Sequence, residues 1–464
     1  MIPPTSGPAG VTRRMFLRST AAIGAGLVLA PTILGAEEKP ADRPLNIGFI
    51  GVGTQGQVLL QNCLKIPGLQ FRAICDIWPF NQGRTVRTLQ KYKQDVRGYA
   101  DYREMLSAEK SLDAVIIASP DWMHAEHAIA CLQAGVHVYC EKEMSNSLEK
   151  ARQMVVAARE TKRLLQIGHQ RRSNPRYLHS YAKILQEARL LGRITHVYGQ
   201  WNRSTASTNP RGWALGADLD DASLKQYGYD SMQRLCNWRW FKKYGGGPLA
   251  DLGSHQIDVF NWFLGTPPRA VMATGGRDYY KDFELPDNVL ALYDFETAAG
   301  PVRGFYQVVS TSSARNYFET FMGTDGTLQI SESAGACRLF AEGHLTPLAD
   351  RHPWQPWADK GYILQEKKPD DETKKEPEKD KTPDEAIMEV YKSKPPTTFL
   401  LRLDLEKSLH MPHLENFFAA IRTGVPLNCP AEVGYETAVS VLRVNEALEA
   451  GRRIEFKPEE FRVA

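Results

Sequence analysis

Between residues 45 and 167, short apolar runs alternate with stretches of helical periodicity. Five apolar runs predict buried strands: Ile47–Ile50, Phe71–Cys75, Asp113–Ala118, His137–Cys140 and Leu164–Ile167. Helices are predicted between them, among others at Asn81–Lys93, His124–Ala134 and Ser147–Glu160. Nearly continuous apolar strands separated by helices are typical of a parallel sheet covered on both faces. The pattern predicts an α/β domain over residues 37–167.

The pattern changes near residue 168, where strands begin to follow one another closely with only turns between them. These strands are predicted at Ile194–Trp201, Ala270–Gly275, Val289–Phe295, Arg303–Ser310 and Tyr317–Gly323. One helix, at about Gly253–Leu264, interrupts them. This arrangement predicts an α+β domain with a largely antiparallel open sheet over residues 168–410. Two amphipathic helices, Met411–Arg422 and Ala431–Ala450, are expected to pack back on the body over residues 411–464.

A glycine-rich loop joins the first predicted strand to a helical pattern at Val58–Leu64. The loop reads Gly51-Val52-Gly53-Thr54-Gln55-Gly56, a G-x-G-x-x-G. The first glycine permits a tight turn, the second lets the backbone approach a pyrophosphate, and the third lets helix and strand pack closely. Phosphates then lie at a helix N-terminus, where free N–H groups favour negative charge. The strand before the loop and the helix after it make a dinucleotide site the favoured interpretation.

Polar residues follow the ends of the neighbouring predicted strands. Asp76 ends the second strand, twenty residues beyond Gly56, where an acid accepts hydrogen bonds from the adenosine ribose. Further candidates are Ser119 and His124 after the third strand, and Glu141 and Lys142 after the fourth. Ligands of such sheets bind outside the carboxyl ends of the strands. We therefore expect all of these residues at one cofactor crevice.

Length and charge limit the possible functions. A chain of 464 residues exceeds one ordinary core, so two domains are expected. The net charge is +3, but three arginines lie in the first 36 residues, which contain no acid; subtracting them from 57 bases leaves 54 bases against 54 acids. Nothing in this balance indicates nucleic acid or an anionic membrane surface as a partner. Seven scattered cysteines lack metal-ligand spacing, so no metal site is predicted.

Two segments are expected to lie outside the folded body. Residues 1–36 carry Thr12-Arg13-Arg14-Met15-Phe16-Leu17, a twin-arginine signature, before the weakly apolar Ala21–Leu34. This predicts export of the folded protein to the periplasm, with no membrane span after signal removal. An uncleaved anchor helix is the alternative. Residues 366–385 form a mixed-charge run poor in apolar side chains, which predicts a solvated insertion without a catalytic role.

The second domain supplies a candidate proton acceptor. After Gly245-Gly246-Gly247, Asp251, His255 and Asp258 follow at intervals of four and three residues, so one helix face would carry all three. A carboxylate beside an imidazole fixes its tautomer and raises its basicity, as alcohol oxidation requires. Lys142 would donate a hydrogen bond to the substrate hydroxyl. A sugar pocket is a further interpretation for a set of aromatic and basic residues: Trp201, Trp238, Trp240, Arg171, Arg172 and Arg239.

With these motifs in order, the chain resembles the glucose–fructose oxidoreductase/inositol dehydrogenase (Gfo/Idh/MocA) family from about Leu45 to the C-terminus. The motifs are the glycine loop, Tyr99-Ala100-Asp101-Tyr102, Glu141-Lys142-Glu143, Gly168-His169-Gln170-Arg171-Arg172, the run Gly245–Asp258, and His413 with Phe417 and Ile421-Arg422. The resemblance implies a Rossmann domain and places a catalytic lysine, aspartate and histidine on Lys142, Asp251 and His255. The chain departs from the family pattern at Glu143, where proline is usual.

These observations predict an exported oxidoreductase that transfers hydride to or from a carbinol carbon of a sugar or polyol. NAD is favoured over NADP because Asp76 would repel a 2′-phosphate, and tight cofactor retention is expected because the periplasm offers no free nicotinamide. His255 would accept the proton, with Asp251 orienting it. Two alternatives stay open: a glycosidase that uses transient oxidation, and a non-catalytic binding protein. By analogy with the family, a homo-oligomer is expected.

Overall fold

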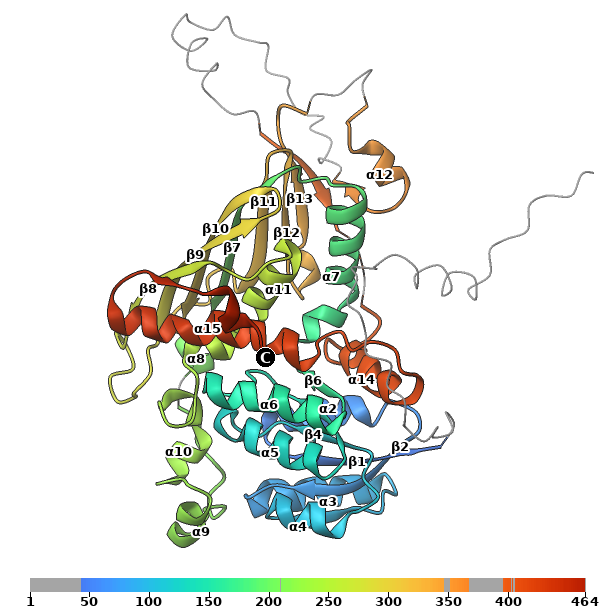
Figure 1. Ribbon diagram of the computed structural model, residues 1–464, viewed down its shortest axis with the longest axis vertical. Helices are drawn as coiled ribbons and strands as arrows, with labels where there is room; N and C mark the ends of the chain where they lie inside the picture. Colours follow the sequence, from blue (N-terminus) through green and yellow to red (C-terminus); the bar gives the residue numbers. More distant parts are fainter. Residues whose placement is uncertain are drawn as a thin grey trace, which may run out of the picture. The chain divides into compact units, whose positions relative to one another are not determined.

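The computed structural model describes residues 43–208, 210–345, 351–366, 395–401, 403 and 405–463 (Figure 1). The twin-arginine segment 1–36 and all but the first residue of the charged run 366–385 lie outside these residues. Within them, no helix is long and apolar enough to cross a membrane.

The N-terminal layer is a parallel sheet of six strands among the described residues. Their order is β3 (Arg97–Tyr99), β2 (Leu69–Cys75), β1 (Leu45–Ile50), β4 (Ala114–Ile117), β5 (His137–Cys140) and β6 (Leu165–Ile167). The helices between strands are α2 (Thr54–Cys63), α3 (Pro79–Lys91), α4 (Tyr102–Ala108), α5 (Asp121–Gln133) and α6 (Leu148–Thr161). All five apolar runs form strands of this sheet, and the short β3 and α4 add to them. The predicted α/β architecture is confirmed.

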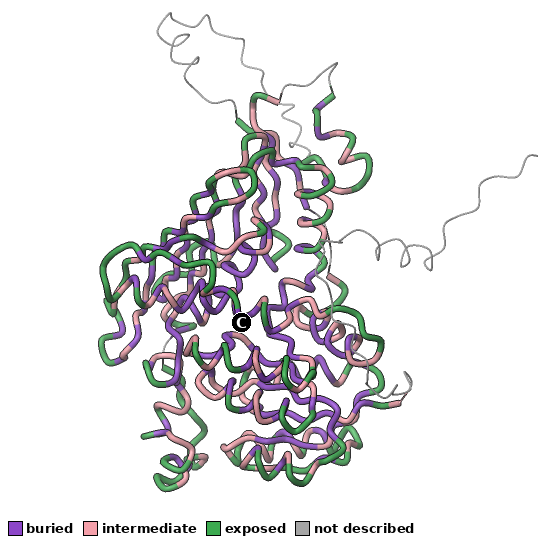
Figure 2. Tube along the Cα trace, in the orientation of Figure 1, coloured by how far each residue is buried: buried purple, intermediate pink, exposed green. Residues whose placement is uncertain are grey.

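Side chains of alternating direction on β1 enter two separate cores. Ile47 and Phe49 pack with residues of α2 and of α14 (Met411–Thr423), while Ile50 belongs to the core on the α5 and α6 side. Figure 2 shows buried residues along both layers of the molecule and exposed ones on the outer helices. A helix from the end of the chain therefore covers one face of the first sheet.

The second layer is a sheet of ten described strands. Their order is β14 (Leu364–Gln365), β15 (Thr397–Leu400), β13 (Arg338–Ala341), β12 (Gly326–Ile330), β11 (Tyr317–Gly323), β7 (Ile194–Asn202), β10 (Gly300–Val309), β9 (Asn288–Thr297), β8 (Ala270–Gly276) and β16 (Ile454–Glu455). Neighbouring strands pair antiparallel except β7 and β10, which are parallel. The expected largely antiparallel sheet is confirmed.

The helices around the second sheet connect it to the first. Those near its inner face are α7 (Pro175–His179), the π-helix η2 (Ser180–Glu187), the π-helix η4 (Leu249–Gly253), α11 (Ser254–Leu264) and α15 (Ala431–Ala450). Shorter pieces are η1 (Gln170–Ser173), η5 (Ala334–Ala336), α12 (Gln355–Asp359) and η6 (Pro458–Phe461). α15 contacts both α6 and β8, so it joins the two layers (Figure 1).

Residues 203–208 and 210–244 form an arm whose helices were not predicted from the sequence. It contains α8 (Thr205–Thr208), α9 (Asp221–Gln226), α10 (Met232–Cys236) and η3 (Trp238–Trp240), and Figure 1 shows α9 and α10 beside the first sheet. Two tryptophans of the first domain donate hydrogen bonds to the arm. Trp78 Nε1 donates to the Ala217 carbonyl at 2.6 Å, and Trp122 Nε1 donates to the Tyr229 hydroxyl at 3.0 Å. The arm thereby closes one side of the crevice at the strand ends.

Candidate active site

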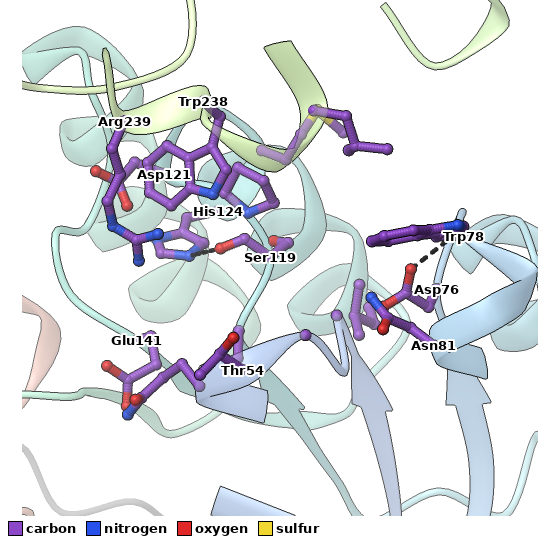
Figure 3. Close-up of a pocket in the computed structure, with 18 of the residues that line it drawn as sticks. Thr54, Asp76, Trp78, Asn81, Ser119, Asp121, His124, Glu141, Trp238 and Arg239 are labelled. Atoms are coloured by element: carbon purple, nitrogen blue, oxygen red, sulfur yellow. Dashed lines mark hydrogen bonds between the residues drawn. The ribbon is translucent and has the colours of Figure 1, made fainter. Parts of the chain in front are cut away.

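A cavity of about 950 Å³ lies at the carboxyl ends of β1, β2, β4 and β5. The glycine loop, the arm, the start of α11 and His410 complete its walls. In Figure 3, Asp76 and Trp78 lie at one end of the pocket, and Asp121, Trp238 and Arg239 lie at the other. A cavity of this size accommodates a ligand much larger than a single sugar.

The three glycines of the loop meet three different constraints. Gly51 has a φ of +84°, which side chains rarely adopt, and its missing Cβ would lie 2.6 Å from the Ser119 nitrogen. A Cβ on Gly56 would lie 2.3 Å from the Gly51 carbonyl oxygen, so this glycine permits the contact of helix and strand. Gly53 has no atom within 4 Å of its Cβ position and caps the N-terminus of α2. That open space is where a pyrophosphate would lie.

Asp76 is held by backbone donors at the end of β2. Its Oδ2 accepts from the Val52 N–H at 2.9 Å, and its Oδ1 accepts from the Trp78 N–H at 2.8 Å. Burial outweighs these bonds and raises the pKa of Asp76 to about 6. Each oxygen retains a lone pair for a ribose hydroxyl. The geometry fits the adenosine end of a dinucleotide.

Two histidines brace the next strand ends. His124 is buried, its Nδ1 lies 2.7 Å from the Glu143 carbonyl, and its Nε2 lies 2.7 Å from the Ser119 carbonyl. Burial lowers the pKa of His124 to about 4, against the two carbonyl contacts, which favour the protonated ring. Ser119 Oγ in turn lies 2.9 Å from His127 Nδ1. His124 lines the cavity, but both its nitrogens contact backbone oxygens. It therefore links the segment after β4 to the segment after β5 and does not point a free nitrogen at a ligand.

Glu141 lies deeper in the same wall. Its Oε1 accepts from the Tyr139 hydroxyl at 3.4 Å, and burial raises the pKa of its carboxyl. Nearby, Gln55 Nε2 lies 3.0 Å from His410 Nε2, which places the residue before α14 against the glycine loop. The C-terminal segment thus contributes a wall to the cofactor crevice.

Lys142 and Asp251 meet across the two layers. Lys142 Nζ donates to the Asp251 carbonyl at 2.5 Å and lies 3.7 Å from Asp251 Oδ1. The same Oδ1 accepts from Arg239 Nε at 2.8 Å. Burial opposes ionisation of Asp251, but the charges of Arg239 and Lys142 prevail and hold its pKa well below the usual range. The ammonium of Lys142 is therefore fixed at the cavity wall by a permanent carboxylate.

His255 lies at the same end of the cavity and is 7% exposed. Its ring lies 5.6 Å from the Trp201 ring and 6.2 Å from the His169 ring. Its Nδ1 has no hydrogen-bond partner among the described residues. Burial, helped by the charge of Lys142, lowers the pKa of His255 well below its usual value. The imidazole is neutral and able to accept a proton.

The expected pairing of Asp251 with His255 is not present. Arg239 and Lys142 take the Asp251 carboxylate, and the residue lies in the π-helical turn η4. A π turn hydrogen-bonds to the fifth residue rather than the fourth, so residues four apart no longer share the face that an α-helix would give them. Asp251 positions Lys142 instead.

Among the residues expected to bind substrate, Trp201 lines the cavity, and so do Trp238 and Arg239. The others lie elsewhere among the described residues. Asp258 is buried and accepts two hydrogen bonds of 2.9 Å from Arg172.

Arg171 is 1% exposed and paired with Glu319 and Glu332, and Trp240 stacks on Phe283 at 5.1 Å. These side chains satisfy buried charge or fill a core, which explains why Arg171, Arg172, Asp258 and Trp240 do not face the cavity.

Sequence reasoning missed several cavity residues because no motif marks them. They are Arg203, Arg211, Asp121, Trp78, Tyr317 and His410. Arg203 and Arg211 belong to the arm, and Tyr317 begins β11. Only the pairing of β7 with β11, where Tyr317 lies opposite Trp201, brings the two rings into contact at 4.6 Å.

Comparison with known proteins agrees with this geometry. Two sequence models of one family match: an oxidoreductase family with an NAD-binding Rossmann fold over residues 45–169, and the GFO/IDH/MocA C-terminal domain over residues 221–329. The chain is 30% identical to an inositol 2-dehydrogenase of Salmonella typhimurium over 164 residues, which are 35% of this chain and 47% of that protein. It is 24% identical to an inositol 2-dehydrogenase of Rubrobacter xylanophilus over 294 residues, or 62% and 72% of the two chains.

Solved structures share the fold. A levoglucosan dehydrogenase in complex with NADH superposes with a TM-score of 0.62 at 19% identity, over 89% of this chain and 99% of that one. The match to the Salmonella protein spans about half of its length. The two family models and the shared fold cover both layers described above. The chain belongs to the Gfo/Idh/MocA family of oxidoreductases with an NAD-binding Rossmann domain.

Proposed function

We propose that this protein transfers hydride between a bound nicotinamide dinucleotide and a carbinol carbon of a sugar or polyol. The observation that carries the proposal is that Lys142 and His255 line the same cavity as the glycine loop, with the Lys142 charge near enough to act on the His255 ring. Asp76 holds the opposite end and favours NAD, since its carboxylate would repel a 2′-phosphate. The named relatives, dehydrogenases of inositol and levoglucosan, support a small polyhydroxylated substrate.

Different side chains would bind the reacting oxygen and accept the hydroxyl proton. The nicotinamide, when bound, supplies a hydride acceptor. Lys142 donates a hydrogen bond to the reacting oxygen, and Asp251 with Arg239 keeps its ammonium in place. His255, held neutral by burial, accepts the hydroxyl proton as hydride leaves the carbon. Trp201 offers a flat apolar surface beside the imidazole for the C–H face of a sugar ring.

We infer that the dinucleotide is retained between turnovers. The arm bonds to Trp78 at the adenosine end, and His410 bonds to Gln55 at the glycine loop, so segments of the second half of the chain cover the crevice at both of these places. Retention would permit one sugar to be oxidised and another reduced on the same cofactor. Together with the twin-arginine signature at Arg13 and Arg14, it supports export of a loaded, folded enzyme to the periplasm.

The outer face of the second sheet supports a homo-oligomer. Met272, Leu292, Phe305 and Tyr198 are direct neighbours on β8, β9, β10 and β7, so they form one apolar row on a single face. Met272 is 49% exposed and Leu292 is 54% exposed. Sedimentation of wild type against Leu292→Lys tests this assignment, because a charge in the row would dissociate such an oligomer.

Cofactor and chemistry are tested separately. Small molecules released by denaturing the purified protein are identified by mass spectrometry, and NAD(H) is expected. Lys142→Met and His255→Asn should each lower kcat by about 10²- to 10⁴-fold while the dinucleotide stays bound. Matched controls are the exposed Lys110→Met and His196→Asn. Unchanged turnover in both active-site variants would refute the assigned roles.

The same preparation separates the alternatives. Chromogenic glycosides are offered beside free sugars. Release of the aglycone without net cofactor reduction would replace the dehydrogenase proposal with a glycosidase that oxidises its substrate transiently. Absence of any dinucleotide from the protein, with sugar binding unchanged in Lys142→Met, would instead indicate a non-catalytic binding protein. Fractionation of cells carrying Arg13→Lys and Arg14→Lys together tests export, and wild-type protein should be periplasmic while the variant remains inside.

A further inference from the structure

The cavity contains more positive side chains than the carboxylates beside them can pair with. Lys142, Arg203, Arg211 and Arg239 all line it. Asp251 serves two of them, since its Oδ1 lies 2.8 Å from Arg239 Nε and 3.7 Å from Lys142 Nζ. Those two cations are therefore satisfied within the protein.

Arg203 and Arg211 have no carboxylate partner among the described residues. The other acids near these cations already pair with another side chain or have a raised pKa. Glu332 pairs with the buried Arg171 and also accepts from Gln170 at 3.1 Å. Asp121 and Glu141 are buried, and burial raises the pKa of both carboxyls, that of Asp121 to about 7. Arg203 and Arg211 thus line the cavity without a carboxylate in direct contact in the described part of the chain, although Asp251 lies close enough to attract both.

The two arginines occupy different parts of the cavity. Arg211 Nη1 donates to Thr54 Oγ1 at 3.3 Å, at the first residue of α2 and beside the open space at Gly53. That position suits the cofactor pyrophosphate. Arg203 follows the last residue of β7, and its guanidinium lies 5.3 Å from the Trp201 ring. Because Trp201 also contacts His255, Arg203 belongs to the substrate side.

We propose that the substrate is an anionic sugar, a uronate or aldonate, whose carboxylate pairs with Arg203 while its carbinol lies between Lys142 and His255. A planar guanidinium binds a carboxylate through two parallel N–H bonds, which fixes orientation as well as charge. The indole of Trp201 limits the orientations of the Arg203 guanidinium and offers an apolar surface to the sugar ring. This inference rests on the proposed hydride transfer and adds the class of substrate to it.

The test compares matched acids and neutral sugars on the full-length holoenzyme. The pairs are glucuronate with glucose, galacturonate with galactose, and gluconate with glucitol; glucose 6-phosphate is included as a phosphate-bearing anion. Turnover of each is measured by chromatography of the oxidised product with a second sugar present as acceptor, because a retained cofactor gives no net absorbance change. Equilibrium binding is measured by calorimetry. Wild type is compared with Arg203→Met and Arg203→Lys. Arg193→Met is the control, because Arg193 is exposed and lies just before the first residue of β7, whereas Arg203 follows its last residue.

At least one acid should exceed its neutral partner in wild type, and Arg203→Met should lower kcat/KM for that acid by about 30-fold or more. Turnover of the neutral partner should change less than about threefold, and Arg203→Lys should restore part of the preference, since it retains charge but not the fork. The Arg193→Met variant should behave as wild type. These results together would support the assignment.

Other outcomes overturn it in distinguishable ways. Equal use of acids and neutral sugars, or equal loss of both in Arg203→Met, would refute an anionic substrate while leaving hydride transfer intact. Preference for the sugar phosphate alone would refute a carboxylate. Weaker NAD binding in Arg203→Met, with no change in acid preference, would assign Arg203 to the pyrophosphate. Binding of an acid that depends on Arg203 without turnover of any sugar would retain the anion site and refute the proposed reaction.

Discussion

Glu143 follows Lys142 and lies entirely inside the protein. Its exposed fraction is 0%. One carboxyl oxygen accepts from the Met144 N–H at 2.8 Å, and the other has no partner among the described residues. Burial raises the pKa of Glu143 from 4.5 to about 8, against the opposing effect of the Met144 bond. The folded protein therefore keeps this carboxyl protonated at neutral pH.

The raised pKa makes stability depend on pH with a definite sign. Below about pH 4.5 the carboxyl is protonated in both the folded and the unfolded chain. Between 4.5 and about 8 the unfolded chain releases the proton and the folded chain retains it, so stability falls as pH rises, by roughly 1.4 kcal/mol per pH unit. The loss reaches roughly 3 kcal/mol at pH 7 and levels off above pH 8.

Glu143→Gln removes this dependence, because the amide resembles the protonated acid and ionises in neither state. Relative to wild type, its free energy of unfolding should rise by roughly 3 kcal/mol between pH 4.5 and pH 7. Urea denaturation at four pH values from 5 to 8 measures the difference. Glu160→Gln is the matched control, since it changes the same group at an exposed position of α6.

The reasoning depends on the difference between two curves and not on either alone. Titrating groups that do not interact with Glu143 affect wild type and variant alike, so their contributions cancel. Parallel curves for wild type and Glu143→Gln would mean that Glu143 is ionised in the folded protein, and would refute the argument from burial. A slope difference shared by Glu160→Gln would refute its assignment to this site.

Three further predictions concern the cofactor loop and the core. Gly56→Ala places a Cβ 2.3 Å from the Gly51 oxygen, so calorimetry of the cofactor-free protein should show a lower Tm. Gly53→Ala should keep the wild-type Tm of the cofactor-free protein and weaken NAD binding, because its Cβ enters only open space. Equal Tm values for the two cofactor-free variants would contradict this. Arg171→Met leaves two buried carboxylates without their cation and should cost about 3–5 kcal/mol in urea unfolding, and an unchanged midpoint would show that the ion cluster is dispensable. The pKa of Asp76 is about 6 without cofactor, so the Kd for NAD should rise as pH falls below 6, because the protonated carboxyl is a weaker acceptor for the ribose hydroxyls. Asp76→Asn should remove this pH dependence in a fluorescence titration of NAD binding. A wild-type Kd that does not change with pH would contradict the prediction.

Local sequence determined the parts of this protein that depend on near neighbours in the chain. Apolar runs and helical periodicity located the strands of the first sheet, since alternation and period report directly which side of an element is buried. His137–Cys140 and Ala431–Ala450 have the predicted bounds. The glycine loop predicted its own turn, because the φ of Gly51 and the contact of Gly56 arise within six residues.

Only the tertiary structure decided which side chains face the cavity. Asp258 and Arg171 resemble site residues in sequence, but each is satisfied by a partner that lies 86 or more residues away. Arg203 and Arg211 carry no motif and reach the cavity because the arm folds over the first sheet. Periodicity identifies a buried face but not what covers it.

The contacts of Asp251 reflect both its position in the sequence and the tertiary structure around it. Its spacing from His255 predicted a shared helix face, whereas the π turn and the approach of Arg239 and Lys142 gave its carboxylate other partners. The energy of an ion pair depends on distance and burial in three dimensions, neither of which spacing along the chain records. The sequence therefore identified the candidate groups, and the fold determined which of them contact one another.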